Sequence, residues 1–123
     1  MAKKILIVDD IPEVRECIRD FLADEGYEII EAPDGLAGLQ SFKENLPDLV
    51  ITDIVMPKME GIETIKELFK INSEVKVIAI SGKDKGSSTY LKAAELLGAQ
   101  RIFEKPLDMV RLVDEVKSLL GDA

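Results

Sequence analysis

Short apolar runs rich in β-branched residues recur along the chain, and they predict β-strands that are covered on both faces. The clearest runs span residues 5–8, 49–51 and 75–80, and shorter runs at 27–30 and 101–103 predict two flanking strands. Each run is only a few residues long, which is typical of strands rather than of buried helices. The pattern therefore predicts five short strands.

Between these runs the apolar residues take the spacing of amphipathic helices. The first such segment carries one apolar stripe that is expected to face the core, formed by Val14, Ile18, Phe21 and Leu22. Further helices are predicted at about 35–45, 61–71, 87–97 and 108–120, with Gly98 and Gly121 as C-terminal caps. Strand and helix alternate five times, which predicts an α/β fold of the doubly wound class, with a parallel sheet, right-handed crossovers and helices on both faces.

The composition narrows the possible functions. A length of 123 residues suits one compact domain, so residues 1–123 are expected to form a single domain with no second, DNA-binding or other effector domain. The formal charge of −8 argues against direct nucleic-acid binding and favours proteins or metal ions as partners. No apolar run is long enough for a membrane span or a signal peptide, so a cytoplasmic protein without membrane contact is expected.

The chain contains no histidine and one cysteine. Without an imidazole it has no histidine general base, metal ligand or phosphoryl carrier of its own. Any phosphohistidine in its chemistry must therefore belong to another molecule. Cys17 has no second cysteine to pair with and lies beside Ile18 in the first predicted helix, and it is interpreted as a packing residue without a redox role.

Polar side chains stand where four of the predicted strands end. They are Asp9 and Asp10 after the first strand, Asp53 after the third, Ser81 after the fourth and Lys105 after the fifth. Because the carboxyl ends of parallel strands lie at one edge of a sheet, these side chains are expected to converge where such folds bind ligands. Three carboxylates placed together repel one another unless a cation joins them, and oxygen ligands suit Mg²⁺ rather than zinc. The pattern predicts a magnesium site.

Each of these residues also has a purely structural interpretation. Asp10 followed by Glu13 resembles a capping box at the start of the first helix, and for that pair alone a helix cap is favoured, although a cap is compatible with metal binding. Asp53 could be a loop residue, Ser81 a turn residue and Lys105 a solvated lysine. Their coincidence at the ends of the strands favours a functional site.

Four segments carry a resemblance to a known family. They are ILIVDD (5–10), PDLVITDIVMPKMEG (47–61), VIAISG (77–82) and FEKP (103–106). Over essentially its whole length the sequence resembles the CheY-like receiver domain of two-component response regulators. The resemblance implies a five-stranded sheet in the order 2-1-3-4-5, acceptance of a phosphoryl group from a histidine kinase or histidine phosphotransfer protein, and switched contacts with a downstream protein target. A monomer or weak dimer is expected.

The resemblance also implies roles for the residues at the strand ends. Asp53 is expected to be the phosphorylated nucleophile, and an ionised carboxylate needs no general base. Asp10 and Asp53 are expected to bind Mg²⁺ directly and Asp9 mainly through water, while the backbone carbonyl of Val55 completes the protein's share. Lys105 is expected to pair with a phosphoryl oxygen and to stabilise, with the metal, the charge of the transition state.

Switching residues are implied in the same way. Ser81 is expected to supply a hydroxyl donor, to move to the phosphoryl oxygen and to vacate space that the aromatic ring of Phe103 then fills. Pro106 resembles the proline that follows a cis peptide bond, so the Lys105–Pro106 bond is expected to be cis.

Two further expectations concern docking and the lifetime of the signal. Ile11 and Pro12 follow the acid pair and lie off the core stripe, so they are expected to form an apolar rim on which a histidine kinase docks. The resemblance places Val55 and Lys83 where side chains admit or orient the attacking water. Neither residue can accept a proton from water, so slow autodephosphorylation is predicted.

Three other classes share parts of this pattern. Phosphatases of the haloacid-dehalogenase type also use a strand-end Asp with Mg²⁺, but they carry a second carboxylate two residues later, where this chain has Val55. A flavodoxin-like binder needs a phosphate loop where this chain has Asp9 and Asp10. A receiver that has lost phosphorylation is disfavoured by the acids, serine and lysine retained at the strand ends. The sequence therefore predicts a phosphoacceptor switch rather than an enzyme that turns over outside substrates.

Overall fold

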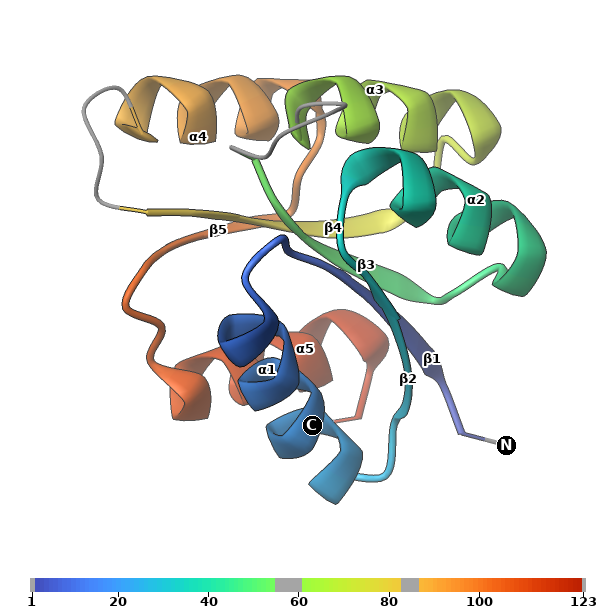
Figure 1. Cartoon of the computed structure of the whole chain (residues 1–123), viewed down its shortest axis with the longest axis vertical. Helices are drawn as coiled ribbons and strands as arrows, with labels where there is room; N and C mark the ends of the chain where they lie inside the picture. Colours follow the sequence, from blue (N-terminus) through green and yellow to red (C-terminus); the bar gives the residue numbers. More distant parts are fainter. Residues whose placement is uncertain (1, 55–60, 83–86, 123) are drawn as a thin grey trace.

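Figure 1 shows the computed structural model of the chain, in which residues 2–54, 61–82 and 87–122 are described. Within these ranges five parallel strands form one sheet in the order β2-β1-β3-β4-β5. They are β1 (Lys4–Val8), β2 (Glu28–Ala32), β3 (Leu49–Asp53), β4 (Lys76–Ser81) and β5 (Arg101–Glu104). Since β1 pairs with both β2 and β3, the strand order reverses beside β1, and the predicted doubly wound topology is confirmed.

Five helices connect and cover the strands of the described chain. They are α1 (Pro12–Asp24), α2 (Gly35–Asn45), α3 (Gly61–Ile71), α4 (Ser87–Leu97) and α5 (Met109–Leu120). Helices α1 and α5 lie on one face of the sheet, and α2, α3 and α4 lie on the other (Figure 1). The carboxyl ends of all five strands therefore point to one edge of a three-layered molecule, where the loops into the helices begin.

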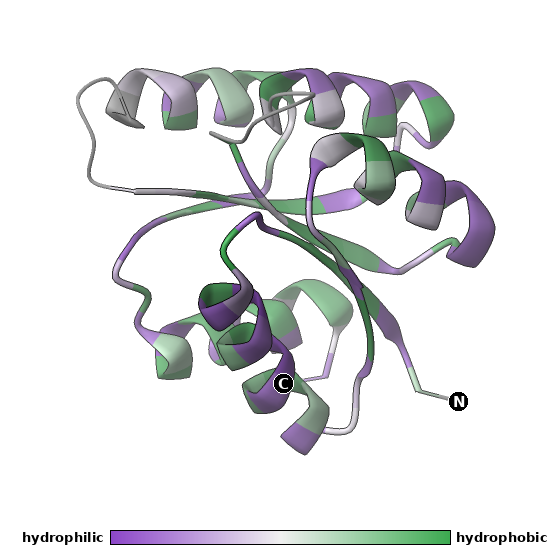
Figure 2. Ribbon diagram, in the orientation of Figure 1, coloured by the Kyte–Doolittle hydropathy of each residue, from purple (hydrophilic) through white to green (hydrophobic). Residues whose placement is uncertain are grey.

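Two apolar cores hold the layers together, because successive side chains of a strand point to opposite faces of the sheet. The core under α1 and α5 includes Ile5, Ile7, Ile51, Ile80 and Phe103, and the core under the other three helices includes Leu6, Val8, Phe42, Val50 and Ala79. Figure 2 shows the strands hydrophobic over much of their length, whereas the helices alternate hydrophobic and hydrophilic positions. A Cβ at Gly38 would lie 2.9 Å from Cγ2 of Val8, so glycine lets α2 pack closely on β1.

The predicted helix bounds at 35–45, 61–71 and 87–97 match α2, α3 and α4. The last helix begins one residue later than predicted, because Asp108 is its N-cap and its side chain accepts a hydrogen bond from the amide of Arg111. Gly98 and Gly121 follow α4 and α5 with positive φ, the conformation expected of glycine caps.

The start of α1 differs from the prediction that Asp10 caps it. The N-cap is Ile11, no side chain caps the helix, and Pro12 occupies its first turn. The amide of Ile11 instead donates to Oδ1 of Asp9 at 2.9 Å. The carboxylate of Asp9 thus orders the turn, and the capping-box interpretation of Asp10 and Glu13 is wrong.

Two side chains of α1 are also more exposed than predicted. Ile18 and Leu22 are fully buried, but Phe21 is 45% exposed, because the buried stripe is narrow and Phe21 lies at its margin. Cys17 is a free and exposed thiol, so the interpretation of Cys17 as a packing residue is wrong.

The helices of the described residues are short and amphipathic. None of them is both long enough and apolar enough to cross a bilayer.

Candidate functional site

The predicted strand-end residues converge at the carboxyl edge of the sheet. Asp9 follows β1, Asp53 ends β3 and Ser81 ends β4, and these three residues are 1%, 4% and 1% exposed. Charged groups that are this deeply buried need a compensating charge or hydrogen bond, since the charged form is otherwise strongly disfavoured.

Lys105 brings a positive charge to the buried carboxylates. Its Nζ lies 2.8 Å from Oδ2 of Asp53 and 3.2 Å from Oδ2 of Asp9. Its backbone amide donates to the carbonyl of Ser81 at 2.7 Å, which extends the pairing of β4 and β5 past the end of the strand. The Lys105–Pro106 peptide bond is cis, as predicted.

Burial and ion pairing shift the pKa values of Asp9 and Lys105 in opposite directions. Burial raises the pKa of Asp9, and the amide of Ile11 and the ammonium of Lys105 lower it by less. Burial lowers the pKa of Lys105, but its hydrogen bond and ion pair with Asp53, together with Asp9, outweigh that effect and leave the pKa raised. The lysine therefore stays charged, whereas the surroundings of Asp9 disfavour its charged form.

The three carboxylates fit a metal ion. Each of Asp9, Asp10 and Asp53 offers one oxygen, and these oxygens all lie within 4.8 Å of one another. The Ser81 hydroxyl beside them is buried without a hydrogen-bond partner among the described residues, so the site has room for a further polar ligand. An all-oxygen set with few protein ligands suits Mg²⁺, which keeps several waters. The predicted ligand Val55 lies outside the described residues.

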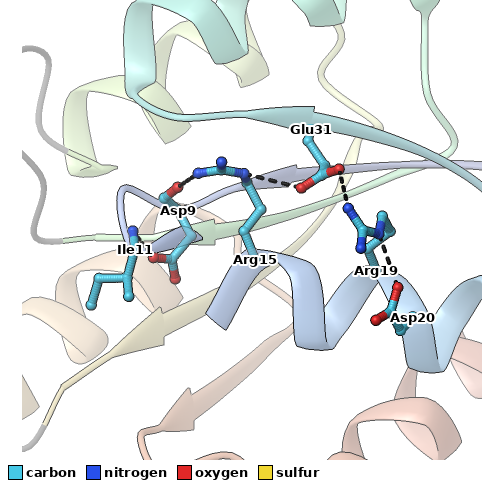
Figure 3. Close-up of polar contacts among 6 residues, drawn as sticks. All are labelled: Asp9, Ile11, Arg15, Arg19, Asp20 and Glu31. Atoms are coloured by element: carbon cyan, nitrogen blue, oxygen red, sulfur yellow. Dashed lines mark hydrogen bonds and ion pairs between the residues drawn. The ribbon is translucent and has the colours of Figure 1, made fainter. Parts of the chain in front are cut away.

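The turn that carries Asp9 and Asp10 is held by contacts that sequence reasoning missed. Figure 3 shows the guanidinium of Arg15 between the Asp9 backbone and Glu31 on β2. Nη1 of Arg15 donates to the carbonyl oxygen of Asp9 at 2.7 Å, and Nε donates to Oε1 of Glu31 at 3.1 Å. An arginine in the first turn of a helix can reach back to the preceding loop, but the sequence did not distinguish Arg15 from Arg19.

The structure contradicts the predicted movement of Phe103. In the β4–β5 register Phe103 lies opposite Ile80, and both belong to the core under α1 and α5. Ser81 is one residue beyond Ile80 and therefore points to the other face of the sheet. Phe103 cannot fill space that Ser81 vacates, because the sheet separates them. Ile102 is the β5 residue that packs against the core on the Ser81 side.

The rim of the site is apolar on the α1 side, as predicted. Ile11 and Pro12 are exposed beside the acid pair. Next to them a groove of about 270 Å³ runs between α1 and the loop after β5, and its lining includes Val14, Cys17 and Leu107. Residues 83–86, which include Lys83, lie outside the described residues.

The sequence is similar to proteins of one known family. The sequence matches the family described as the response regulator receiver domain over residues 5–117. It is 36% identical over 122 residues to chemotaxis protein CheY of Bacillus subtilis (strain 168), covering 98% of this chain and 100% of that protein. It is 35% identical over 120 residues to sporulation initiation phosphotransferase F of the same strain, covering 98% and 95%.

A solved structure shows the same fold. The crystal structure of a response regulator receiver domain protein from Clostridium thermocellum matches with a TM-score of 0.90 and 30% sequence identity, over 97% of this chain and 94% of that one. A parallel five-stranded fold with acids and a lysine at its carboxyl edge is the architecture of a two-component signalling module. The chain belongs to the response regulator receiver domain family, as the resemblance implied.

Proposed function

We propose that this chain accepts a phosphoryl group on Asp53 from the phosphohistidine of a histidine kinase or histidine phosphotransfer protein, with Mg²⁺ as its cofactor. The observation that carries the proposal is a buried strand-end carboxylate, Asp53, held against an ammonium and within reach of two further carboxylates. A structural ion pair alone does not account for the additional carboxylates, since each adds a costly negative charge.

The transfer is a single displacement at phosphorus. A carboxylate oxygen of Asp53 attacks the phosphorus atom of the donor, a P–O bond forms and the P–N bond to the donor's imidazole breaks. The electron pair of that bond stays on the nitrogen, so a donor ring that is protonated on its other nitrogen leaves as neutral imidazole. The donor must be another molecule, because this chain has no histidine.

The residues around Asp53 bind and orient the phosphoryl group. The Lys105 ammonium, already 2.8 Å from the Asp53 carboxylate, can move its contact to a phosphoryl oxygen. The hydroxyl of Ser81 is buried without a partner among the described residues, and it can donate to another phosphoryl oxygen. Asp10 and Asp53 would hold the magnesium ion directly and Asp9 through water. When bound, the ion neutralises negative charge that the transfer gathers on the phosphoryl oxygens.

The chain is proposed to be a switch with slow self-hydrolysis. A phosphatase of the Asp-x-Asp type needs a second carboxylate two residues after the nucleophile, and Val55 stands there. Neither Val55 nor Lys83 can accept a proton from the attacking water. These residues support a long-lived phosphoryl group.

The signal is proposed to leave through protein contacts of a monomer or weak dimer. The names of two similar proteins illustrate two kinds of output: one is a chemotaxis protein and the other is a phosphotransferase. Phosphorylated chain that returns its phosphoryl group to a histidine phosphotransfer domain would act as a relay. Phosphorylated chain that instead gains affinity for a target protein would act as a docking switch.

Transfer from a phosphohistidine donor tests the proposal. A histidine kinase domain labelled with radioactive phosphate should lose its label to the wild-type chain in the presence of Mg²⁺. Label should not move to Asp53→Asn, nor to the wild-type chain in excess EDTA. Equal labelling of the wild type and Asp53→Asn would disprove the phosphoacceptor assignment, and normal labelling in EDTA would disprove the metal assignment.

A further inference from the structure

Arg15 is placed to control the backbone that carries the magnesium ligands. Its side chain is largely shielded from solvent, and Nη1 donates to the carbonyl oxygen of Asp9 at 2.7 Å. That oxygen belongs to the planar peptide unit joining Asp9 to Asp10. The contact therefore fixes the plane on which the Cα atoms of both residues lie.

The preceding peptide unit is fixed as well. The amide of Asp9 donates to the carbonyl of Ala32 at 3.2 Å, so β2 holds the plane on the other side of the Asp9 Cα atom. With both planes held, the φ and ψ angles of Asp9 are determined. Those angles set the direction in which the side chain of Asp9 leaves the backbone. The plane that follows Asp10 is held in turn, because the amide of Ile11 donates to Oδ1 of Asp9 at 2.9 Å, so the side chain of Asp10 also lies between two held planes.

The guanidinium is itself held in one orientation. Its Nε donates to Oε1 of Glu31 at 3.1 Å, while the other oxygen of Glu31 accepts from Nη1 of Arg19 at 3.1 Å (Figure 3). Glu31 lies on β2 opposite Ile7, one residue before Ala32, so the network rests on the sheet. Of these two arginines, Arg15 is the one that contacts both the strand and the Asp9 carbonyl. A planar guanidinium can make both contacts at once, whereas a single ammonium cannot.

We infer that Arg15, oriented by Glu31, is a positioning residue that aims the Asp9 and Asp10 carboxylates at the magnesium ion. The inference rests on the proposed function, because it assumes that these carboxylates bind the metal. Outer residues that orient metal ligands typically affect metal affinity or activity by about 10- to 100-fold.

Because Arg15 is charged, replacing it changes the electrostatics of the site as well as the position of the ligands. The two effects on magnesium affinity can be told apart. Removing a positive charge near three carboxylates should by itself strengthen the binding of a divalent cation. Removing a contact that positions the ligands should weaken that binding. The two explanations therefore predict changes of opposite sign.

Magnesium affinity is to be measured on the full chain by calorimetry or by titration of amide resonances. Arg15→Gln is expected to bind Mg²⁺ about tenfold more weakly than the wild type. Arg19→Gln is the matched control: it loses the same charge and its own contact with Glu31, but it keeps the contact between Arg15 and Asp9. It is expected to bind Mg²⁺ as tightly as the wild type or more tightly.

Three further readouts separate positioning from general damage. Arg15→Lys keeps the charge without the fork and is expected to bind as weakly as Arg15→Gln. Glu31→Gln keeps the Arg15 side chain but loosens it, so a smaller loss of affinity is expected. In metal-free buffer the amide resonances of Asp10 and Ile11 should shift in Arg15→Gln and not in Arg19→Gln.

The possible results decide the inference. Unchanged or stronger binding by Arg15→Gln, or full affinity in Arg15→Lys, would overturn it while leaving the proposed function intact. If Arg15→Gln does not fold, the test passes to Glu31→Gln. An affinity of Glu31→Gln for Mg²⁺ equal to that of the wild type would then overturn the inference. Failure of the wild type itself to bind Mg²⁺ would overturn both the inference and the metal assignment beneath it.

Discussion

Replacing Lys105 with methionine is expected to destabilise the protein at neutral pH in metal-free buffer, and Mg²⁺ is expected to restore much of the loss. Methionine keeps the length of the side chain but removes the charge that lies 2.8 Å from Asp53 and 3.2 Å from Asp9. The variant leaves both carboxylates buried without that charge. A bound cation would supply the missing compensation.

The size of the effect follows from the burial of the ion pairs. Removing one partner of a buried pair costs roughly 3–5 kcal/mol, whereas exposed pairs contribute about 0–1 kcal/mol. The carboxylates are buried, but the side chain of Lys105 is 17% exposed, so solvent screens part of the interaction. A loss of about 2–4 kcal/mol in the free energy of unfolding is therefore expected at pH 7.

The pH dependence has a definite sign. The pKa of Lys105 is raised in the folded protein, so its stabilisation is fully present below the unfolded-state pKa and is lost only as pH rises through the folded-state pKa. The pKa of Asp9 is also raised, so its ionisation disfavours the folded state as pH rises above the unfolded-state pKa. Acidification toward the raised pKa of Asp9 protonates that carboxylate, so the stability difference between wild type and Lys105→Met should shrink.

Urea unfolding at pH 7 and at pH 4.5, with EDTA or with excess Mg²⁺, measures these differences. The control is Lys70→Met, because Lys70 is 70% exposed and pairs with Glu67 at the surface. This control should lose no more than about 0.5 kcal/mol under every condition. Equal stabilities of the two variants in EDTA, or a Mg²⁺ effect no larger in Lys105→Met than in wild type, would refute the reasoning.

Four other substitutions test separate parts of the structure. Asp9→Asn should raise the free energy of unfolding in metal-free buffer, because burial raises the pKa of Asp9; a less stable variant would contradict this. Gly61→Ala should cost at least about 3 kcal/mol in urea unfolding, since its Cβ would lie 2.4 Å from the carbonyl oxygen of Asp53. Gly38→Ala, which meets only a side chain, should cost less, and equal costs would count against this explanation. Ile11→Asp should slow phosphoryl transfer from a kinase and spare labelling by acetyl phosphate; equal loss of both would place the damage at the site instead.

The fold could be predicted from the sequence where burial restricts the residue types that can occur. Strands that are covered on both faces must be apolar throughout, so the polar residues that interrupt each run mark its ends. For the same reason Asp9, Asp53 and Ser81 were correctly placed at one edge of the sheet. Helix bounds were predicted well where a glycine or a polar cap marks the end.

The predictions that were wrong or missing depend on the direction in which a side chain or a backbone group points. Both Ile102 and Phe103 are apolar, so only the register with β4 shows that Phe103 faces away from Ser81. The exposure of Phe21 depends on how narrowly α1 packs, which a period of 3.6 residues does not give. The contact between Arg15 and the Asp9 carbonyl requires the direction of a backbone oxygen, and no sequence pattern encodes that direction.

Locating the phosphoryl group tests the central claim most directly. The full chain is incubated with acetyl phosphate and Mg²⁺, then reduced with borohydride, which converts an aspartyl phosphate to homoserine. Peptide mass spectrometry should find homoserine at position 53 in the wild type and nowhere in Asp53→Asn or in protein treated with EDTA. Homoserine at Asp9 or Asp10 with none at position 53, or no reduction at any aspartate, would contradict the assignment of Asp53 as the phosphoacceptor.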